Sequence, residues 1–155
     1  AIAEVKGYTT RVAGTPSNVA FPGAFPPPSW PGDLLASPPF GLPGLSLAAF
    51  DPGRHTHAEW VDGKVHETGF TTVFPPNTVV PYPAGGTTYD VDFVSATESS
   101  LGDTYAAVTA RSYHTGLVNV LLMGGSVRSV NNGISQTTWR ALGTRSGGEV
   151  IGNDF

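Results

Sequence analysis

The sequence predicts a β-rich α+β fold: an antiparallel sheet of short strands and hairpins, a long proline-rich excursion, and one short C-terminal helix. Three observations support this. The 155 residues include 20 glycines and 14 prolines but only 13% charged residues, a composition that favours turns over long amphipathic helices. Short apolar segments alternate with Gly, Pro and Asn, and only the last third changes to a helical spacing. The length predicts a single domain, residues 1–155.

The N-terminal third combines one expected strand, residues 1–12, with a proline-rich segment. Residues 16–52 contain ten prolines mixed with aromatic side chains. Proline removes ladder donors and fixes φ, so neither a regular sheet nor a long helix is expected there. We interpret the segment as an ordered excursion that docks on the sheet or on a neighbouring subunit, with a flexible linker as the alternative. The candidate contact residues are Phe21, Phe25, Trp30 and Phe40.

Residues 57–70 predict a β-hairpin, because Asp62-Gly63 offers a two-residue type I′ loop. In that register His57, Glu59 and His66 share one face, where two imidazoles and a carboxylate could bind zinc or another divalent metal. The alternative is a solvent-exposed hairpin face with a modest pair between Glu59 and His66.

Three further strands are expected in the middle of the chain. Residues 71–80 should continue as a strand that the prolines interrupt, and Pro81 with Pro83 confines this segment to a sheet edge. Residues 89–94 alternate, which predicts a strand with Tyr89, Val91 and Phe93 pointing inward. Residues 105–108 predict another apolar strand.

The strand at residues 89–94 carries a candidate cation site. Asp90 and Asp92 would lie on one strand face about 7 Å apart. Together with Asp103 they could chelate calcium, provided that backbone carbonyls complete the shell. The alternative is that both carboxylates face solvent on the outer side of the sheet.

Residues 111–155 contain the clearest local pattern. An apolar run at residues 117–122, a reversal at Gly124-Gly125 and a return at residues 126–130 predict a hairpin. A second turn at residues 131–133 leads into a short helix. Ser135 is the expected N-cap.

Two further residues complete the expected helix. Ile134 should pack on Trp139 as a hydrophobic staple. Gly143 stands where a left-handed residue would end the helix.

The same residues carry a family resemblance. SYHTGLVNVLLMGGSVRSV followed by ISQTTWRALGTRSGGEVIG resembles the C-terminal end of a large bacterial family of pilin-like proteins of unknown function, and the likeness extends from about Glu4 onward. The family has an N-terminal prepilin segment and a signature of His, nine residues, then Asp-Gly. His114 is followed by nine residues and then by Gly124-Gly125, so the signature Asp is absent. His114 is therefore expected to have a structural role, such as a hydrogen bond to a loop carbonyl.

The resemblance implies a structural subunit at the cell surface or outside the cell. Family members begin with a basic leader and a long apolar helix, and because Ala1 starts the chain abruptly we expect a fragment or processed form. Function would lie in protein contacts, with further copies or with other pilin-like subunits in a filament or secretion-type assembly. The alternative is a secreted carbohydrate- or metal-binding module using Trp30 or Trp60 as a stacking platform. No cofactor beyond a divalent metal is expected.

Composition argues against other classes. The net charge is −4 and Lys6 and Lys64 are the only lysines, so no basic stripe could neutralise nucleic acid. Without cysteine there is neither a disulfide framework nor a thiolate zinc site. No apolar stretch has the length of a membrane span. Ser112, His114 and Ser126 lack a Gly-x-Ser-x-Gly motif and an orienting Asp, so no enzyme is expected.

Overall fold

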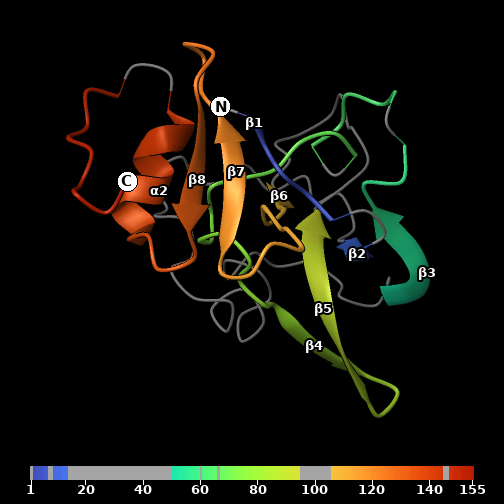
Figure 1. The fold of residues 1–155 in the computed structure, drawn as a ribbon. Coiled ribbons are helices and arrows are strands. Elements are labelled where there is room, and N and C mark those ends of the chain that lie inside the picture. Colours follow the sequence, from blue (N-terminus) through green and yellow to red (C-terminus); the bar gives the residue numbers. More distant parts are fainter. Residues whose placement is uncertain are drawn as a thin grey trace.

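The computed structural model describes residues 2–6, 9–13, 50–59, 61–65, 67–94, 106–144 and 147–155. These residues form a three-stranded sheet, a five-stranded sheet and a short helix (Figure 1). A β-rich fold is therefore confirmed. The proposed contact residues Phe21, Phe25, Trp30 and Phe40 lie outside the described residues, as do Trp60, His66 and Asp103.

The three-stranded sheet has the order β1-β7-β8, with β1 at Ile2–Ala3, β7 at Leu117–Leu121 and β8 at Val127–Asn131. Both pairings are antiparallel, and Leu121 is the partner of Ile2 on one side and of Val127 on the other. The predicted C-terminal hairpin is confirmed. Its turn depends on Gly125, whose φ of 82° is in the region that favours glycine.

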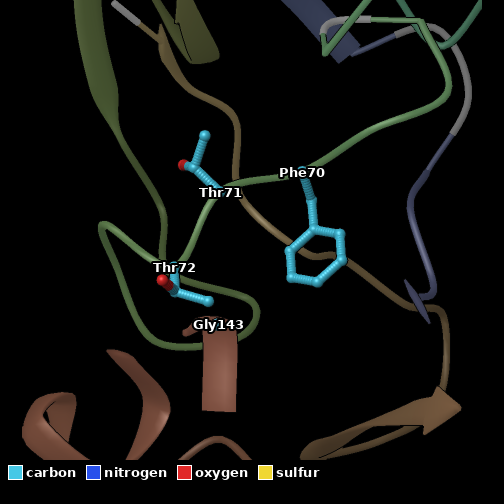
Figure 2. A pocket seen from close by; sticks show the side chains of 4 residues that line it. All are labelled: Phe70, Thr71, Thr72 and Gly143. Atoms are coloured by element: carbon cyan, nitrogen blue, oxygen red, sulfur yellow. The ribbon is translucent and has the colours of Figure 1, made fainter. Parts of the chain in front are cut away.

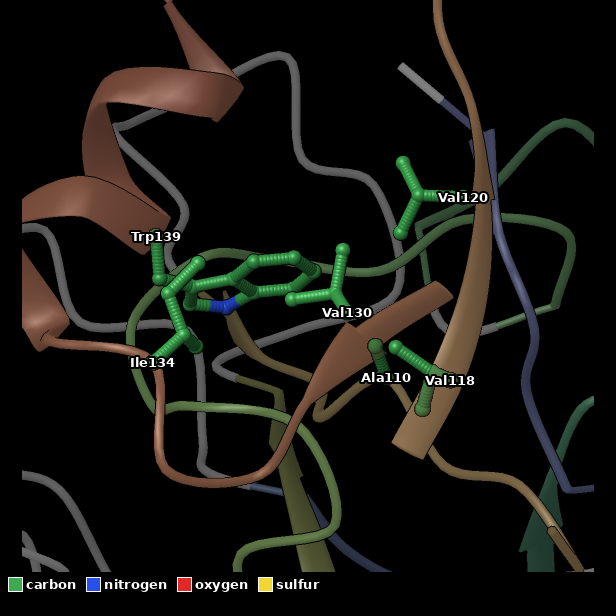
Figure 3. Packing of buried hydrophobic residues seen from close by; sticks show 6 residues of the cluster. All are labelled: Ala110, Val118, Val120, Val130, Ile134 and Trp139. Carbon is green, nitrogen blue, oxygen red and sulfur yellow. The ribbon is translucent and has the colours of Figure 1, made fainter. Parts of the chain in front are cut away.

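Helix α2, Gln136–Gly143, packs on the inner face of this sheet and closes its core (Figure 3). Ser135 is the N-cap and its side chain accepts the Thr138 N–H, as predicted. Ile134 and Trp139 are both buried in one cluster with Val118, Val120, Val130 and Ala110. The staple is therefore confirmed.

The predicted end of the helix is wrong. Gly143 is the last helical residue, and the C-cap Thr144 is extended. A Cβ at position 143 would lie 2.6 Å from the Thr72 hydroxyl oxygen. Gly143 therefore allows a close approach of the 70–72 segment, and it does not supply a left-handed turn.

The five-stranded sheet contains β2 (Thr9–Ala13), β3 (Phe50–Thr56), β4 (Pro81–Ala84), β5 (Thr87–Val94) and β6 (Ala106–Ala107). Its order is β3-β2-β5-β4, with β6 also on β5. The predicted antiparallel pairing is found for β2–β3, β4–β5 and β5–β6, whereas β2 and β5 pair in parallel. The expected strand at residues 1–12 is in fact two strands in two sheets.

Prolines sit at the margins of this sheet. β4, which contains Pro81 and Pro83, is an edge strand, whereas the prediction placed residues 71–80 at the edge. β3 begins at Phe50 and includes Pro52, so the expectation that residues 16–52 hold no sheet strand fails at their end. The register of β2 on β3 shifts between Thr10 and Val12. An edge position with an irregular register is where a strand tolerates proline.

The predicted hairpin at residues 57–70 does not form. Among the described residues there, the backbone makes turns and bends without a strand. The reason is that carboxylates take the N–H groups a ladder would use. Asp62 accepts the Lys64 N–H at 3.1 Å, and Glu67 accepts those of Ala58 and Glu59 at 3.0 Å. Local side-chain bonds of this kind compete with strand pairing.

The next segment, residues 71–80, is likewise not a strand. Its one ladder contact is an isolated parallel bridge between Thr71 and Thr109. Asn77 has a φ of 56°, which breaks an extended run. The Asn77 side chain donates to the Leu117 carbonyl and accepts the Ser112 N–H. The Asn77 side chain therefore fastens this loop to the C-terminal sheet, and the Val73 carbonyl fastens it to α2 by accepting from Gln136 at 2.7 Å.

Candidate interaction surface

The two described calcium candidates meet at an arginine. Asp92 is fully buried, and Arg111 is only 3% exposed. The Arg111 guanidinium pairs with Asp92 through Nη1 and with Asp90 through Nη2, the latter at 3.0 Å. Asp92 also accepts the Thr56 hydroxyl at 2.9 Å and the Thr109 N–H at 3.1 Å. The expectation that both aspartates face solvent is wrong for Asp92.

The charges around Arg111 balance one another inside the fold. Burial by itself would lower the pKa of Arg111, but the charges of Asp92 and Asp90 outweigh it and raise that pKa above its ordinary value. A guanidinium in the position where a cation would sit already balances both carboxylates. The pair joins β5 to the 109–111 segment. Arg111 was missed by sequence reasoning, since nothing local marks which arginine is buried.

A second cluster surrounds Glu4. Its carboxylate accepts the Asn119 N–H at 2.9 Å and the Asn119 side-chain amide at 3.2 Å. The Glu4 carbonyl accepts the Arg111 N–H at 3.0 Å. In a regular β1–β7 ladder the Glu4 carbonyl would accept the Asn119 N–H. Because that carbonyl bonds to Arg111, the Glu4 carboxylate accepts the Asn119 N–H in its place. The Asn119 N–H is the main cause that lowers the pKa of Glu4.

His114 joins the same cluster. Its Nε2 lies 3.2 Å from Glu4 Oε1, and its side chain is 57% exposed. His114 thus contacts the carboxylate of Glu4, which directly follows β1, and the predicted bond to a loop carbonyl is not among its described contacts. A structural role for His114 stays a prediction. Gly124 and Gly125 lie at the other end of β7, in the hairpin turn.

The proposed metal site at His57, Glu59 and His66 is described only in part. His57 Nδ1 lies 2.8 Å from the Glu67 carbonyl, and Glu59 is exposed. Within the described residues no three His, Cys, Asp or Glu side chains lie close enough to hold a metal ion. Because the hairpin does not form, the register that would have aligned these three side chains is lost. Metal binding that involves His66 remains a prediction.

A small pocket of about 330 Å³ lies between the 70–72 segment and the end of α2 (Figure 2). Phe70, Thr71, Thr72 and Gly143 line it. The Thr71 hydroxyl bonds to the Val108 backbone in both directions, at 3.2 and 3.1 Å. Thr71 therefore serves to hold two segments together.

The outer face of the three-stranded sheet is the most distinctive surface. Val118, Val120 and Val130 face the core, so the alternate residues of β7 and β8 face outward. Ile2, Leu121 and Val127 form one cross-strand row there, because each pairs with the next. Their exposed fractions are 63%, 37% and 65%. Met123, in the adjoining turn, is 91% exposed. We call these four residues the apolar row.

A polar row lies beside the apolar row on the same face. It consists of Glu4, Asn119 and Ser129, where the Ser129 hydroxyl donates to Asn119 Oδ1 at 2.9 Å. An apolar centre with a hydrogen-bonded polar border is the composition of protein interfaces. The sequence does contain this signal, since Leu121 and Val127 flank the predicted turn. The partner strand β1 could not be paired with them from sequence.

Comparison with known protein families, with curated proteins and with solved structures finds no match. The fold and this surface therefore define the class as a β-rich domain with an exposed apolar sheet face. Among the described residues, no helix is long and apolar enough to cross a membrane.

Proposed function

We propose that this chain is a structural, pilin-like subunit of an assembly at the cell surface or outside the cell. It acts through contacts with further copies of itself and performs no catalytic turnover. The observation that carries the proposal is the apolar row on the outer face of the three-stranded sheet. The resemblance of residues 111–155 to pilin-like proteins is consistent with it.

The high exposure of the apolar row in the single chain supports its burial against a partner in the assembled state. Full burial of a side chain such as Val, Leu, Ile or Met contributes roughly 1.5–3 kcal/mol. Ile2, Val127 and Met123 are each more than 60% exposed in the single chain, at 63%, 65% and 91%. Contiguous apolar surface of this kind marks interaction sites in soluble domains.

The contacts that the ionisable groups make within the fold also support a structural role. Asp92 and Arg111 neutralise one another inside the fold, and Glu4 completes a strand ladder. Each of these groups stabilises the chain where it stands. Their contacts explain their presence without a substrate.

Sedimentation velocity over a range of protein concentrations tests the proposal. We expect concentration-dependent association of the wild-type chain, and at least a tenfold weaker association for Val127→Lys, because a charge would be buried at the contact. Val79→Lys is the matched control, since Val79 is 61% exposed but outside the row. A wild-type chain that stays monomeric at high concentration would contradict the proposal, as would equal weakening by the two variants.

A further inference from the structure

The free edge of β8 is a second surface with a defined geometry. The Leu122 N–H donates to the Ser126 carbonyl, and the Asn132 N–H donates to the Gly116 carbonyl, both at 2.9 Å. These bonds stand at the two ends of the β7–β8 ladder, so every second residue between them turns its backbone groups toward β7. Arg128 and Val130 bond inward in this way. The backbone groups of Val127, Ser129 and Asn131 therefore point to the other side of β8.

Nothing in the described part of the chain pairs with that side. β8 is the last strand of its sheet, and its only strand neighbour among the described residues is β7. Val127, Ser129 and Asn131 are exposed. Of their edge-facing backbone groups, the Asn131 carbonyl accepts a local bond, from the Ile134 N–H at 3.1 Å.

β8 also lacks several of the features that usually protect an edge strand. Its sequence, Val-Arg-Ser-Val-Asn, has no proline and no lysine, and its pairing with β7 runs without a register shift. The one charge, Arg128, lies 5.2 Å from the centre of the Phe155 ring. That contact draws the guanidinium toward Phe155, which packs against the core on the inner side of the sheet.

We propose that β8 pairs antiparallel with β8 of a second copy about a two-fold axis at Ser129, so that two three-stranded sheets join into one. This inference rests on the proposed function and names one of its contacts. In the paired strands Ser129 faces Ser129 of the second copy. Val127 then faces Asn131, and Arg128 faces Val130, so no like charges are opposed. The strand can thus pair with itself in this register without placing like charges directly opposite each other.

The second copy is favoured as occupant by this match and by the apolar row. The row of Ile2, Leu121 and Val127 ends at the β8 edge. Pairing carries the outer face on into the neighbouring copy, through Asn131 to Leu117. The edge contact leaves the apolar row open for a contact of a different kind. A chain with two separate self-contacts can extend an assembly beyond a dimer.

Cysteine cross-linking tests the register directly, because the chain contains no cysteine. Hydrogen-bonded antiparallel partners have Cα atoms about 5.5 Å apart, within the range that a disulfide spans. We therefore expect Ser129→Cys to form a covalent dimer under mild oxidation, as seen on non-reducing gels. Val127→Cys alone should not, because the two Val127 positions would be about 13 Å apart along the strands. The double variant Val127→Cys/Asn131→Cys should cross-link again.

Thr137→Cys, on the exposed side of α2, measures random collision. The double variant is independent of the Ser129 hydroxyl bond, and a thermal melt of each variant reports folding. If Ser129→Cys and the double variant cross-link no more than Thr137→Cys while the wild type associates, edge pairing is wrong and the proposed function stands. If the wild type is monomeric at every concentration, both proposals fail.

Discussion

The two halves of the molecule stabilise their centres in opposite ways. The C-terminal unit of β7, β8 and α2 has an apolar centre in which Trp139 is 1% exposed and Val118 and Val120 are fully buried. The centre of the five-stranded sheet also holds Val91, yet next to it Asp92 is fully buried on Arg111. The first centre tolerates small losses of contact. The second depends on charges that must stay paired.

This difference determines how each half should respond to mutation. An apolar core loses stability in proportion to the atoms removed and the cavity left. A buried ion pair loses more when one partner is removed than when both are. Single and double substitutions therefore distinguish the two kinds of centre.

Trp139→Ala should have the largest effect. It removes the largest fully buried side chain of the C-terminal unit, and a loss of about 3–5 kcal/mol in unfolding free energy is expected. Urea denaturation followed by circular dichroism measures this loss. Thr137→Ala, two residues earlier on the exposed side of α2, should change stability by less than about 0.5 kcal/mol. A loss below about 1 kcal/mol for Trp139→Ala would show that the cluster is not the core of this half.

Arg111→Met should follow closely, at about 3–4 kcal/mol, because it leaves Asp92 charged and buried without its partner. The double variant Asp92→Leu/Arg111→Met should recover at least half of that loss, since no lone charge remains. The same denaturation experiment measures both. Additive losses in the double variant would mean that the two residues stabilise the fold independently, against the geometry described here.

Glu4→Gln should have the smallest effect. Glu4 links the two halves, because its carboxylate accepts the Asn119 N–H and its carbonyl accepts the Arg111 N–H. We expect a loss below about 1 kcal/mol at pH 7, given the partial exposure of the carboxylate. The pKa of Glu4 is lowered in the folded chain from an ordinary value of 4.5. Its contribution is thus complete above about pH 4.5 and falls away as the pH drops through the lowered pKa. A difference between wild type and variant that is constant from pH 7 to pH 3 would refute this role.

The sequence was sufficient where structure is local. The hairpin around Gly124-Gly125 and the Ser135 cap with its Ile134–Trp139 staple depend on neighbours a few residues away, and they are observed. The β4–β5 hairpin carries an equally local signal that was overlooked. Gly85 and Gly86 both have positive φ, at 56° and 81°, between two extended segments.

The sequence was insufficient where a partner is distant. The hairpin predicted from Asp62-Gly63 does not form, because the Glu67 carboxylate accepts the backbone N–H groups of Ala58 and Glu59, which strand pairing would use. The parallel contact of β2 with β5 joins residues as far apart in sequence as Thr10 and Val91. Asp92 reads as a solvent-facing residue by alternation, and only Arg111, 19 positions later, explains its burial. The same limit applies to the apolar row, which needs Ile2 beside Leu121.

The contact between Glu4 and Asn119 bears on the order in which the parts of the molecule fold. A growing chain makes Glu4 before Asn119, the partner that completes the ladder and follows 115 residues later. Closing so long a loop is entropically costlier than forming the adjacent β7–β8 hairpin, so we expect β1 to dock after that hairpin has formed. Ile2 arrives with β1. A copy in which β1 has not yet docked therefore lacks Ile2 from the apolar row. An assembly that contacts the whole row would then bind fully folded copies in preference to partly folded ones.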